Sequence, residues 1–185
     1  MPNNNKQQAV YIDPLNSDLK SLYYPGNLGD RFWVTAPIGV TATGPTPSAG
    51  ASKGFQIVQT DSGQGVAPTT GMVALWKDRA SYIVTTDQLR SLGRNAVAGI
   101  FNNSVTSGNY TCVQFGGPAY VAITPASAAS VAIGDSIIAS AADNGRADRV
   151  AAGTAPTYNQ IGISEGAAGA NNQALCQLMI EPWTT

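Results

Sequence analysis

The fold is decided by the stretch GMVALWKD at residues 71–78, because the stretch GDSIIAS at residues 134–140 repeats its pattern. Each stretch starts with a glycine and runs into a short apolar segment, and two further apolar segments follow each in the same order. These segments are VAGIF (97–101) and YTCVQF (110–115) in the first copy, and QIGIS (160–164) and ALCQLM (174–179) in the second. A three-segment unit used twice predicts a β scaffold with internal pseudo-symmetry.

The spacing of glycines supports this repeat. Gly71 and Gly99 in the first copy have the same separation in the chain as Gly134 and Gly162 in the second. The sequence offset between the copies is 63 at both glycine positions (134 − 71 and 162 − 99), and it is 64 between Cys112 and Cys176 (176 − 112). We place the two copies at about residues 66–117 and 130–180.

The rest of the chain alternates short β-forming runs with turn residues. The strongest turn signal is the tripeptide DNG at residues 143–145, which favours a tight hairpin. About ten short strands, with turn signals every 8 to 15 residues or so and no long helix, predict an all-β fold, a small barrel or sandwich. The connections are too short for helical crossovers, so we expect antiparallel pairing.

The N-terminal part of the chain differs from this pattern. Polar residues at the tip and three prolines predict an extended N-terminal arm over residues 1–28, followed by a β-rich domain over residues 29–185. Tyrosine and tryptophan favour interface cores, so the aromatic residues near the two chain ends are candidates for contact with another subunit. For Trp33, a place in the core is an equal alternative. The candidate contact residues are Leu22, Tyr23, Tyr24, Trp33 and Trp183.

Composition narrows the classes of function. Charged residues make up 11% of the chain and the net charge is −1, without a basic cluster, so nucleic-acid binding by phosphate neutralisation is not expected. No apolar run approaches the ~20 residues of a membrane-spanning helix, and we expect no membrane contact. The start of the chain lacks the apolar core of a signal peptide, which predicts synthesis in a cytoplasm.

The sequence offers little catalytic chemistry. It contains no histidine, its eleven acidic residues are scattered singly, and it has no phosphate-binding glycine loop followed by Lys-Ser or Lys-Thr. We therefore expect no enzyme activity, no cofactor and no metal site. Cys112 and Cys176 are expected to be two small buried side chains, and a disulfide between pseudo-equivalent strands remains the alternative.

The glycine-led apolar segments, together with FQIV at residues 55–58 and DSG at residues 61–63, resemble phage head decoration, or cement, proteins. The resemblance implies a small β-rich virion protein, often a homotrimer, on the surface of an assembled capsid. It also implies that the major capsid protein is the partner and that contacts between its subunits are stabilised. The alternative is a receptor- or carbohydrate-binding β module of the virion, because exposed Trp and Tyr rings can stack on sugars.

Overall fold

The computed structural model describes residues 28–35, 52–169 and 171–180, and these residues form a nearly all-β structure. The expected N-terminal arm, residues 1–28, lies almost wholly outside the described residues. The only helical elements among the described residues are the 3-10 helix η3 (Gln88–Arg90) and the one-turn helix α1 (Pro125–Ala128). The strands are β1 (Arg31–Thr35), β2 (Ser52–Thr60), β3 (Val73–Asp78), β4 (Ile83–Thr85), β5 (Val97–Phe101), β6 (Tyr110–Ala122), β7 (Ser136–Ala139), β8 (Ala147–Val150), β9 (Gln160–Ser164) and β10 (Gln173–Met179). The all-β prediction is confirmed.

The first copy closes into a five-stranded barrel. The strand order β2-β4-β3-β5-β6 returns to its start through an additional antiparallel pairing of β2 with β6. One strand pair, β2 with β4, is parallel and is an exception to the expected antiparallel pairing. The reason is geometric, because strand direction cannot alternate all the way round a closed ring with an odd number of strands.

The predicted internal repeat is confirmed at the level of individual strand pairs. In the first copy Val73 pairs with Ile100, and in the second copy Ser136 pairs with Ile163. Both members of the pair move by 63 (136 − 73 and 163 − 100). A bulge also recurs at the same place, after Ala74 on β3 and after Ile137 on β7. The two copies therefore share register and irregularities as well as strand order.

The equivalence extends beyond the segments from which it was inferred, and it gives β6 two roles. The β2–β6 pair Val58↔Thr111 corresponds to the β6–β10 pair Val121↔Ala174, with the same offset of 63 for both members (121 − 58 and 174 − 111). The second half of β6 thus takes the place in the second copy that β2 has in the first. A single parallel bridge, Ile123↔Ala147, closes the second ring where the parallel β2–β4 pair closes the first.

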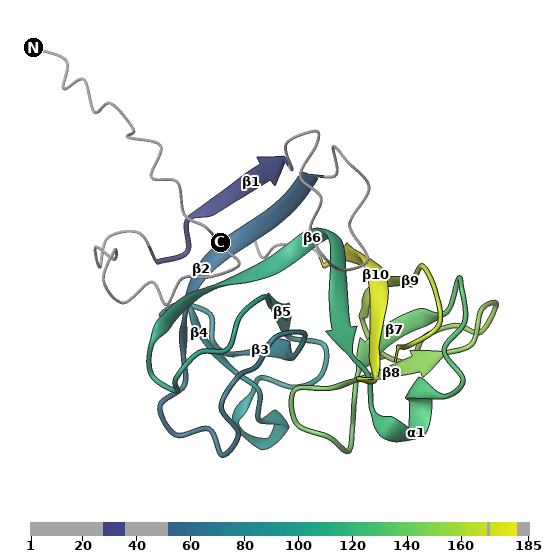
Figure 1. Ribbon diagram of the computed structural model, residues 1–185. Helices are drawn as coiled ribbons and strands as arrows, with labels where there is room; N and C mark the ends of the chain where they lie inside the picture. Colours follow the sequence, from purple (N-terminus) through teal and green to yellow (C-terminus); the bar gives the residue numbers. More distant parts are fainter. Residues whose placement is uncertain (1–27, 36–51, 170, 181–185) are drawn as a thin grey trace, which may run out of the picture.

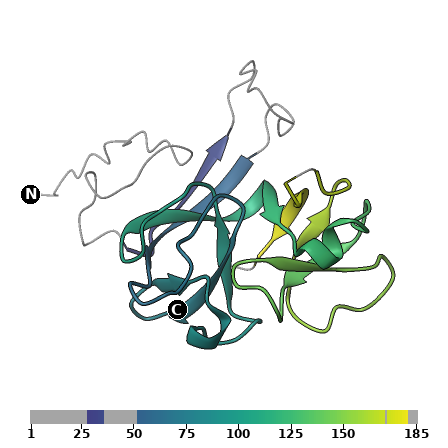
Figure 2. The same cartoon turned by 60° about the horizontal axis from the view of Figure 1, so that its bottom comes forward.

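The result is two lobes fused along one bent strand of 13 residues. β3, β4 and β5 belong to one lobe, and β7 to β10 with α1 belong to the other, while β6 runs from the first to the second (Figure 1). The same division into two lobes is visible when the molecule is turned (Figure 2).

Glycine permits the bend in β6. Gly117 has φ +80, and a Cβ atom at this position would lie 2.1 Å from the Ser52 carbonyl oxygen. The backbone on both sides of Gly117 is held in place by the side chain of Gln114, which is fully buried. Its Nε2 donates hydrogen bonds to the carbonyl oxygens of Gly116 at 3.0 Å and Pro118 at 2.9 Å.

The core continues from one lobe into the other. Alternate residues of β3 serve two clusters: Ala74 and Trp76 pack within the first barrel, whereas Val73 and Leu75 join a larger cluster that includes Ile137 of the second copy. Since side chains alternate across a strand, β3 is covered on both faces. The two lobes therefore share an apolar interface.

The cysteines are free and buried, so the alternative of a disulfide between them is wrong. The strand pairs also correct their expected equivalence. Ser164↔Cys176 in the second copy corresponds to Phe101↔Val113 in the first, so Cys176 matches Val113 and not Cys112. A shift of one residue moves a side chain to the other face of the sheet, which explains why the two thiols lie in different clusters.

Neither thiol is expected to react in the folded protein. Burial raises the pKa of Cys112 and of Cys176 to about 12, which leaves a thiolate fraction of about 10⁻⁴ at pH 8. Titration with a chromogenic disulfide reagent should detect no fast-reacting thiol in native buffer and two in denaturant. Rapid stoichiometric labelling of the native protein would contradict the burial of these groups.

Candidate interaction surface

Trp33 is the one predicted contact residue that the structure describes, and it is exposed. It lies on β1 opposite Gly54 of β2, and 62% of its surface is accessible. Its ring meets the buried Phe115 ring edge-on, with centroids 5.4 Å apart and planes at 84°. The alternative of a core position for Trp33 is therefore wrong. Leu22, Tyr23, Tyr24 and Trp183 lie outside the described residues.

Two glycines explain how Trp33 is held. A Cβ atom on Gly116 would lie 2.8 Å from Cη2 of the indole, and one on Gly54 would lie 3.1 Å from it. The indole thus rests on bare backbone of β2 and β6. This close approach anchors one side of the ring and leaves the rest exposed.

Met179 extends the apolar surface beside Trp33. It is directly opposite Gly116 in the β6–β10 pair and is 54% exposed. Directly opposed residues of an antiparallel pair share a face of the sheet, so Met179 and the indole lie on the same face at Gly116. Lys53 pairs with Val34 next to this site, and burial lowers the pKa of its amine. We call Trp33, Gly116 and Met179 the Trp33 patch.

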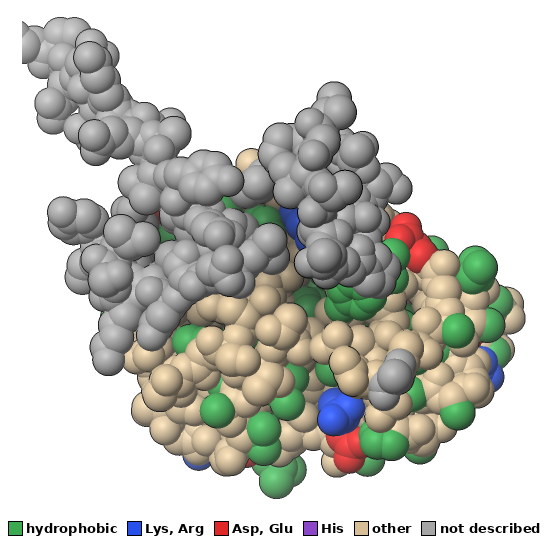
Figure 3. All heavy atoms as spheres, in the orientation of Figure 1, with side chains coloured by type: hydrophobic (Ala, Val, Ile, Leu, Met, Phe, Trp, Pro, Cys, Tyr) green, Lys and Arg blue, Asp and Glu red, His purple; other side chains and the backbone are tan. Residues whose placement is uncertain are grey.

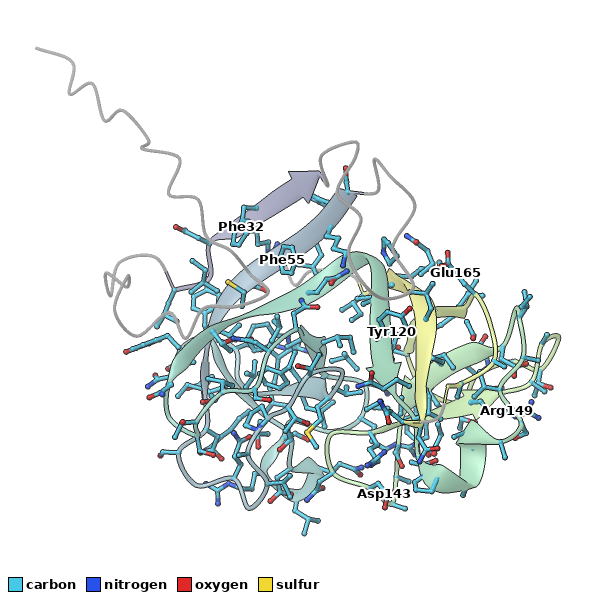
Figure 4. All side chains as sticks on the ribbon, in the orientation of Figure 1. Phe32, Phe55, Tyr120, Asp143, Arg149 and Glu165 are labelled. Carbon is cyan, nitrogen blue, oxygen red and sulfur yellow. The ribbon has the colours of Figure 1, made fainter. Side chains whose placement is uncertain are left out.

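A second exposed apolar region lies in the loop between β4 and β5. Leu89 is 96% exposed and Leu92 is 59% exposed. The loop is fixed to the second lobe, because the Gln88 backbone N–H donates to Asn144 Oδ1 at 3.2 Å and the Gln88 side chain donates to the Asp143 carbonyl at 3.3 Å. Asp143 and Phe32, the neighbour of Trp33, are at opposite ends of the molecule (Figure 4). The two apolar regions are therefore far apart.

The deeply buried carboxylate of Asp61 serves the fold. It accepts hydrogen bonds from Lys77 Nζ at 2.8 Å, Arg90 Nε at 2.6 Å and the Gly63 backbone N–H at 3.0 Å. Burial alone would raise its pKa, but the hydrogen bonds from Arg90, Lys77 and Gly63 outweigh burial and hold the pKa well below its usual range. Asp61 is thus charged at neutral pH and unsuited to donate a proton.

Asp135 of the second copy is also a buried, hydrogen-bonded carboxylate, although it is not the positional counterpart of Asp61. It accepts from the backbone N–H groups of Ala132 and Ala152 at 2.9 and 3.0 Å, and from Arg149 Nη1 at 3.0 Å. Burial alone would raise the pKa of Asp135, but these donors lower it by more, so the pKa lies below its usual range. Among the described residues, no group of three or more His, Cys, Asp and Glu side chains could hold a metal ion. The face shown in Figure 3 has only scattered charges among uncharged and hydrophobic atoms.

Comparisons with protein families, curated proteins and solved structures find no match to this chain. None of the helices in the described part of the chain is long and apolar enough to cross a membrane. The arrangement of the described residues therefore has to carry any functional argument.

Met179, Leu89 and Leu92 were not predicted as contact residues. Leu89 and Leu92 lie in a short polar loop that is too short to bury both side chains, so the sequence carried a signal for their exposure. Met179 carried no such signal, because its exposure depends on the pairing of β10 with the glycine bend of β6.

Proposed function

We propose that this protein is a structural virion protein that binds the outside of an assembled phage capsid and stabilises contacts between major capsid subunits. The observation that carries the proposal is the pair of exposed apolar regions on opposite sides of the molecule, the Trp33 patch and the Leu89–Leu92 loop. A body with one exposed apolar region on each of two opposite sides suits a clip that contacts two neighbours. The structural engagement of Asp61 and Asp135 supports a role without catalysis.

Mass action explains how such a clip would work. A protein that binds only the assembled lattice stabilises that lattice by its binding free energy. Two regions on one scaffold raise the effective concentration of the second contact once the first has formed, and a homotrimer would multiply this effect. The proposed location is the capsid surface, and the proposed partners are the major capsid protein and two further copies of this chain.

The test is co-sedimentation with capsids of the same phage assembled without this protein. Trp33→Ala should weaken binding about 30-fold, as expected for an interface tryptophan worth about 2 kcal/mol. Leu89→Ser/Leu92→Ser should weaken it comparably. Ile133→Ser is the matched control, because Ile133 is also apolar and 76% exposed but belongs to neither region. Sedimentation equilibrium of the free protein should give the mass of three chains.

The proposal would be contradicted if the protein were monomeric in solution and did not co-sediment with capsids, and if all variants behaved like wild type. The second candidate is a carbohydrate-binding module of the virion, favoured by the exposed face of the Trp33 indole. In that case Trp33→Ala would abolish binding on a glycan array, whereas Leu89→Ser/Leu92→Ser would leave it unchanged.

A further inference from the structure

The Leu89–Leu92 loop presents two leucines to solvent from a backbone that is held in place. Leu89 is 96% exposed and Leu92 is 59% exposed, and both lie in the connection between β4 and β5. A side chain on a mobile loop loses conformational entropy when it binds a partner, and this loss weakens the binding. A loop that is fixed beforehand avoids most of this cost. The contacts that fix the loop are therefore informative about its role.

The loop is fixed to the first lobe at two points. Arg90 Nε donates to the buried carboxylate of Asp61 at 2.6 Å, and Lys77 Nζ donates to the same carboxylate at 2.8 Å. The Leu92 backbone N–H donates to the carbonyl oxygen of Trp76 on β3 at 2.7 Å. Since Arg90 lies between the two leucines in the sequence, its bond to Asp61 holds the middle of the loop against the barrel.

The loop is also fixed to the second lobe and braced within itself. Gln88 donates from its backbone N–H to Asn144 Oδ1 and from its side chain to the Asp143 carbonyl oxygen, at 3.2 and 3.3 Å. The carboxylate of Asp87 accepts from the Leu89 backbone N–H at 2.9 Å and so caps η3. Together with the contacts to the first lobe, these bonds set the position of the backbone that carries both leucines.

The second copy of the repeat has a loop of the same length at the same place. The offset of 63 holds before the loop, where Trp76↔Val84 corresponds to Ala139↔Ala147 (139 − 76 and 147 − 84), and it holds after the loop, where β5 corresponds to β9. The counterparts, each 63 higher, of Asp61, Gln88, Leu89, Arg90 and Leu92 are Thr124, Ala151, Ala152, Gly153 and Ala155.

The leucines and the side chains that support them thus occur together in the first copy, and the second copy has neither in its sequence. The second ring of strands closes with threonine and glycine at the positions of Asp61 and Arg90, so this ion pair is not a requirement for closing such a ring. In the first copy the pair accompanies two exposed leucines. The joint occurrence indicates that the supports position the leucines for a contact.

The charges of the loop are satisfied within the chain, and this defines the chemistry of a suitable partner. Residues 87–94 contain three charged side chains, those of Asp87, Arg90 and Arg94. The first caps η3 and the second pairs with the buried carboxylate of Asp61. Arg94 Nε donates to the Ala139 carbonyl oxygen at 2.9 Å, and its guanidinium lies 3.8 Å from the centre of the Tyr158 ring. The complement of such a loop is an uncharged, apolar pocket.

We infer that the Leu89–Leu92 loop is a preformed protrusion that fits an uncharged, apolar pocket of a major capsid subunit, with Gln88 and Arg90 as positioning residues for its two leucines. The inference rests on the proposed function for the identity of the partner. It adds the chemistry of the partner's site, and it explains why this loop, and not its counterpart in the second copy, makes the contact.

Removal of the support from the second lobe tests the positioning role while both leucines stay in place. Gln88→Ala/Asn144→Ala should weaken binding to capsids assembled without this protein about 10-fold, because the released loop has to be ordered on binding. The control is Thr154→Ala/Thr157→Ala, which changes two exposed residues of the counterpart loop and should bind like wild type. Co-sedimentation over a range of protein concentrations measures these affinities.

Amide hydrogen exchange of the free proteins reads the state of the loop without any partner. The backbone N–H groups of Leu89 and Arg90 donate to Asp87 at 2.9 and 3.2 Å. They should exchange about 10-fold faster in Gln88→Ala/Asn144→Ala than in wild type or the control. The thermal unfolding midpoints of the two double variants should agree, which separates loosening of the loop from loss of the fold.

Salt dependence tests the chemistry of the partner's site. The ratio of the wild-type affinity to that of Leu89→Ser/Leu92→Ser isolates the contribution of the loop. This ratio should change less than about 2-fold between roughly 50 and 500 mM NaCl, because no charge pair forms at the contact. A larger fall of the ratio with salt would show a charged partner site and overturn the inference.

Two further results would overturn it. If Gln88→Ala/Asn144→Ala matched wild type in capsid affinity and in loop exchange, the positioning role would be wrong, whereas the proposed function would stand because the capsid is still bound. If wild type itself did not bind capsids, the proposed function would fail and the inference would fail with it.

Discussion

Gly117→Ala is expected to lower the free energy of unfolding by about 3–5 kcal/mol, the range of the most severe single substitutions. Two effects add at this position. The backbone is left-handed, with φ +80, and the new methyl group would lie 2.1 Å from the Ser52 carbonyl oxygen, where neither backbone segment can yield cheaply. Urea denaturation followed by tryptophan fluorescence measures the loss as a lower midpoint.

Gly153→Ala is the matched control for this substitution. Gly153 has nearly the same backbone conformation, with φ +83, but nothing lies within 4 Å of the position its Cβ would take. It isolates the conformational cost, about 1–2 kcal/mol. Equal losses for Gly117→Ala and Gly153→Ala would mean that the close approach of β6 to Ser52 is unimportant.

Asp61→Asn is expected to cost about 2–3 kcal/mol, because three donors aimed at a buried carboxylate lose its charge. The amide has the size of the carboxylate but turns an NH2 group toward one of the cations. Thermal unfolding at pH 7 measures the effect. Asp87→Asn is the control, since Asp87 caps η3 by accepting from the Leu89 backbone N–H and asparagine can accept in the same way.

The same substitution should also flatten the pH dependence of stability. The pKa of Asp61 is lower in the folded than in the unfolded chain, so its contribution is fully present above the unfolded pKa of about 4 and is lost as pH falls toward the folded pKa. Wild type should lose stability steadily from pH 5 to pH 2, and Asp61→Asn should lose less over this range. Parallel curves for the two proteins would contradict the assigned role of Asp61.

The repeat could be predicted from the sequence where backbone geometry demands glycine. Gly71 and Gly134 are both left-handed, with φ +86 and +85, and a Cβ at Gly99 or Gly162 would collide with the carbonyl oxygen of the equivalent Gln114 or Gln177. Substitution of glycine at these positions is therefore costly. The strands between them need only an apolar face, so their identities diverged and the cysteines suggested an offset one position too long.

Two features were beyond a local pattern. The parallel β2–β4 pair follows from closing a ring of five strands, and no stretch of residues encodes that count. The double role of β6 could not be read from the sequence, because its two halves match different strands. The second half of β6 is the counterpart of β2, and the first half is the counterpart of β10. Of the candidate site, the exposure of Trp33 agrees with its predicted place at a contact surface, whereas Met179 depends on a tertiary pairing with Gly116.

The strand common to both lobes has a mechanical consequence. Tandem domains joined by a flexible linker can move and unfold independently, but here the single strand β6 is part of both lobes. Heating should therefore produce one calorimetric peak rather than two. Partners bound on opposite sides of such a body would be held at a fixed distance from each other.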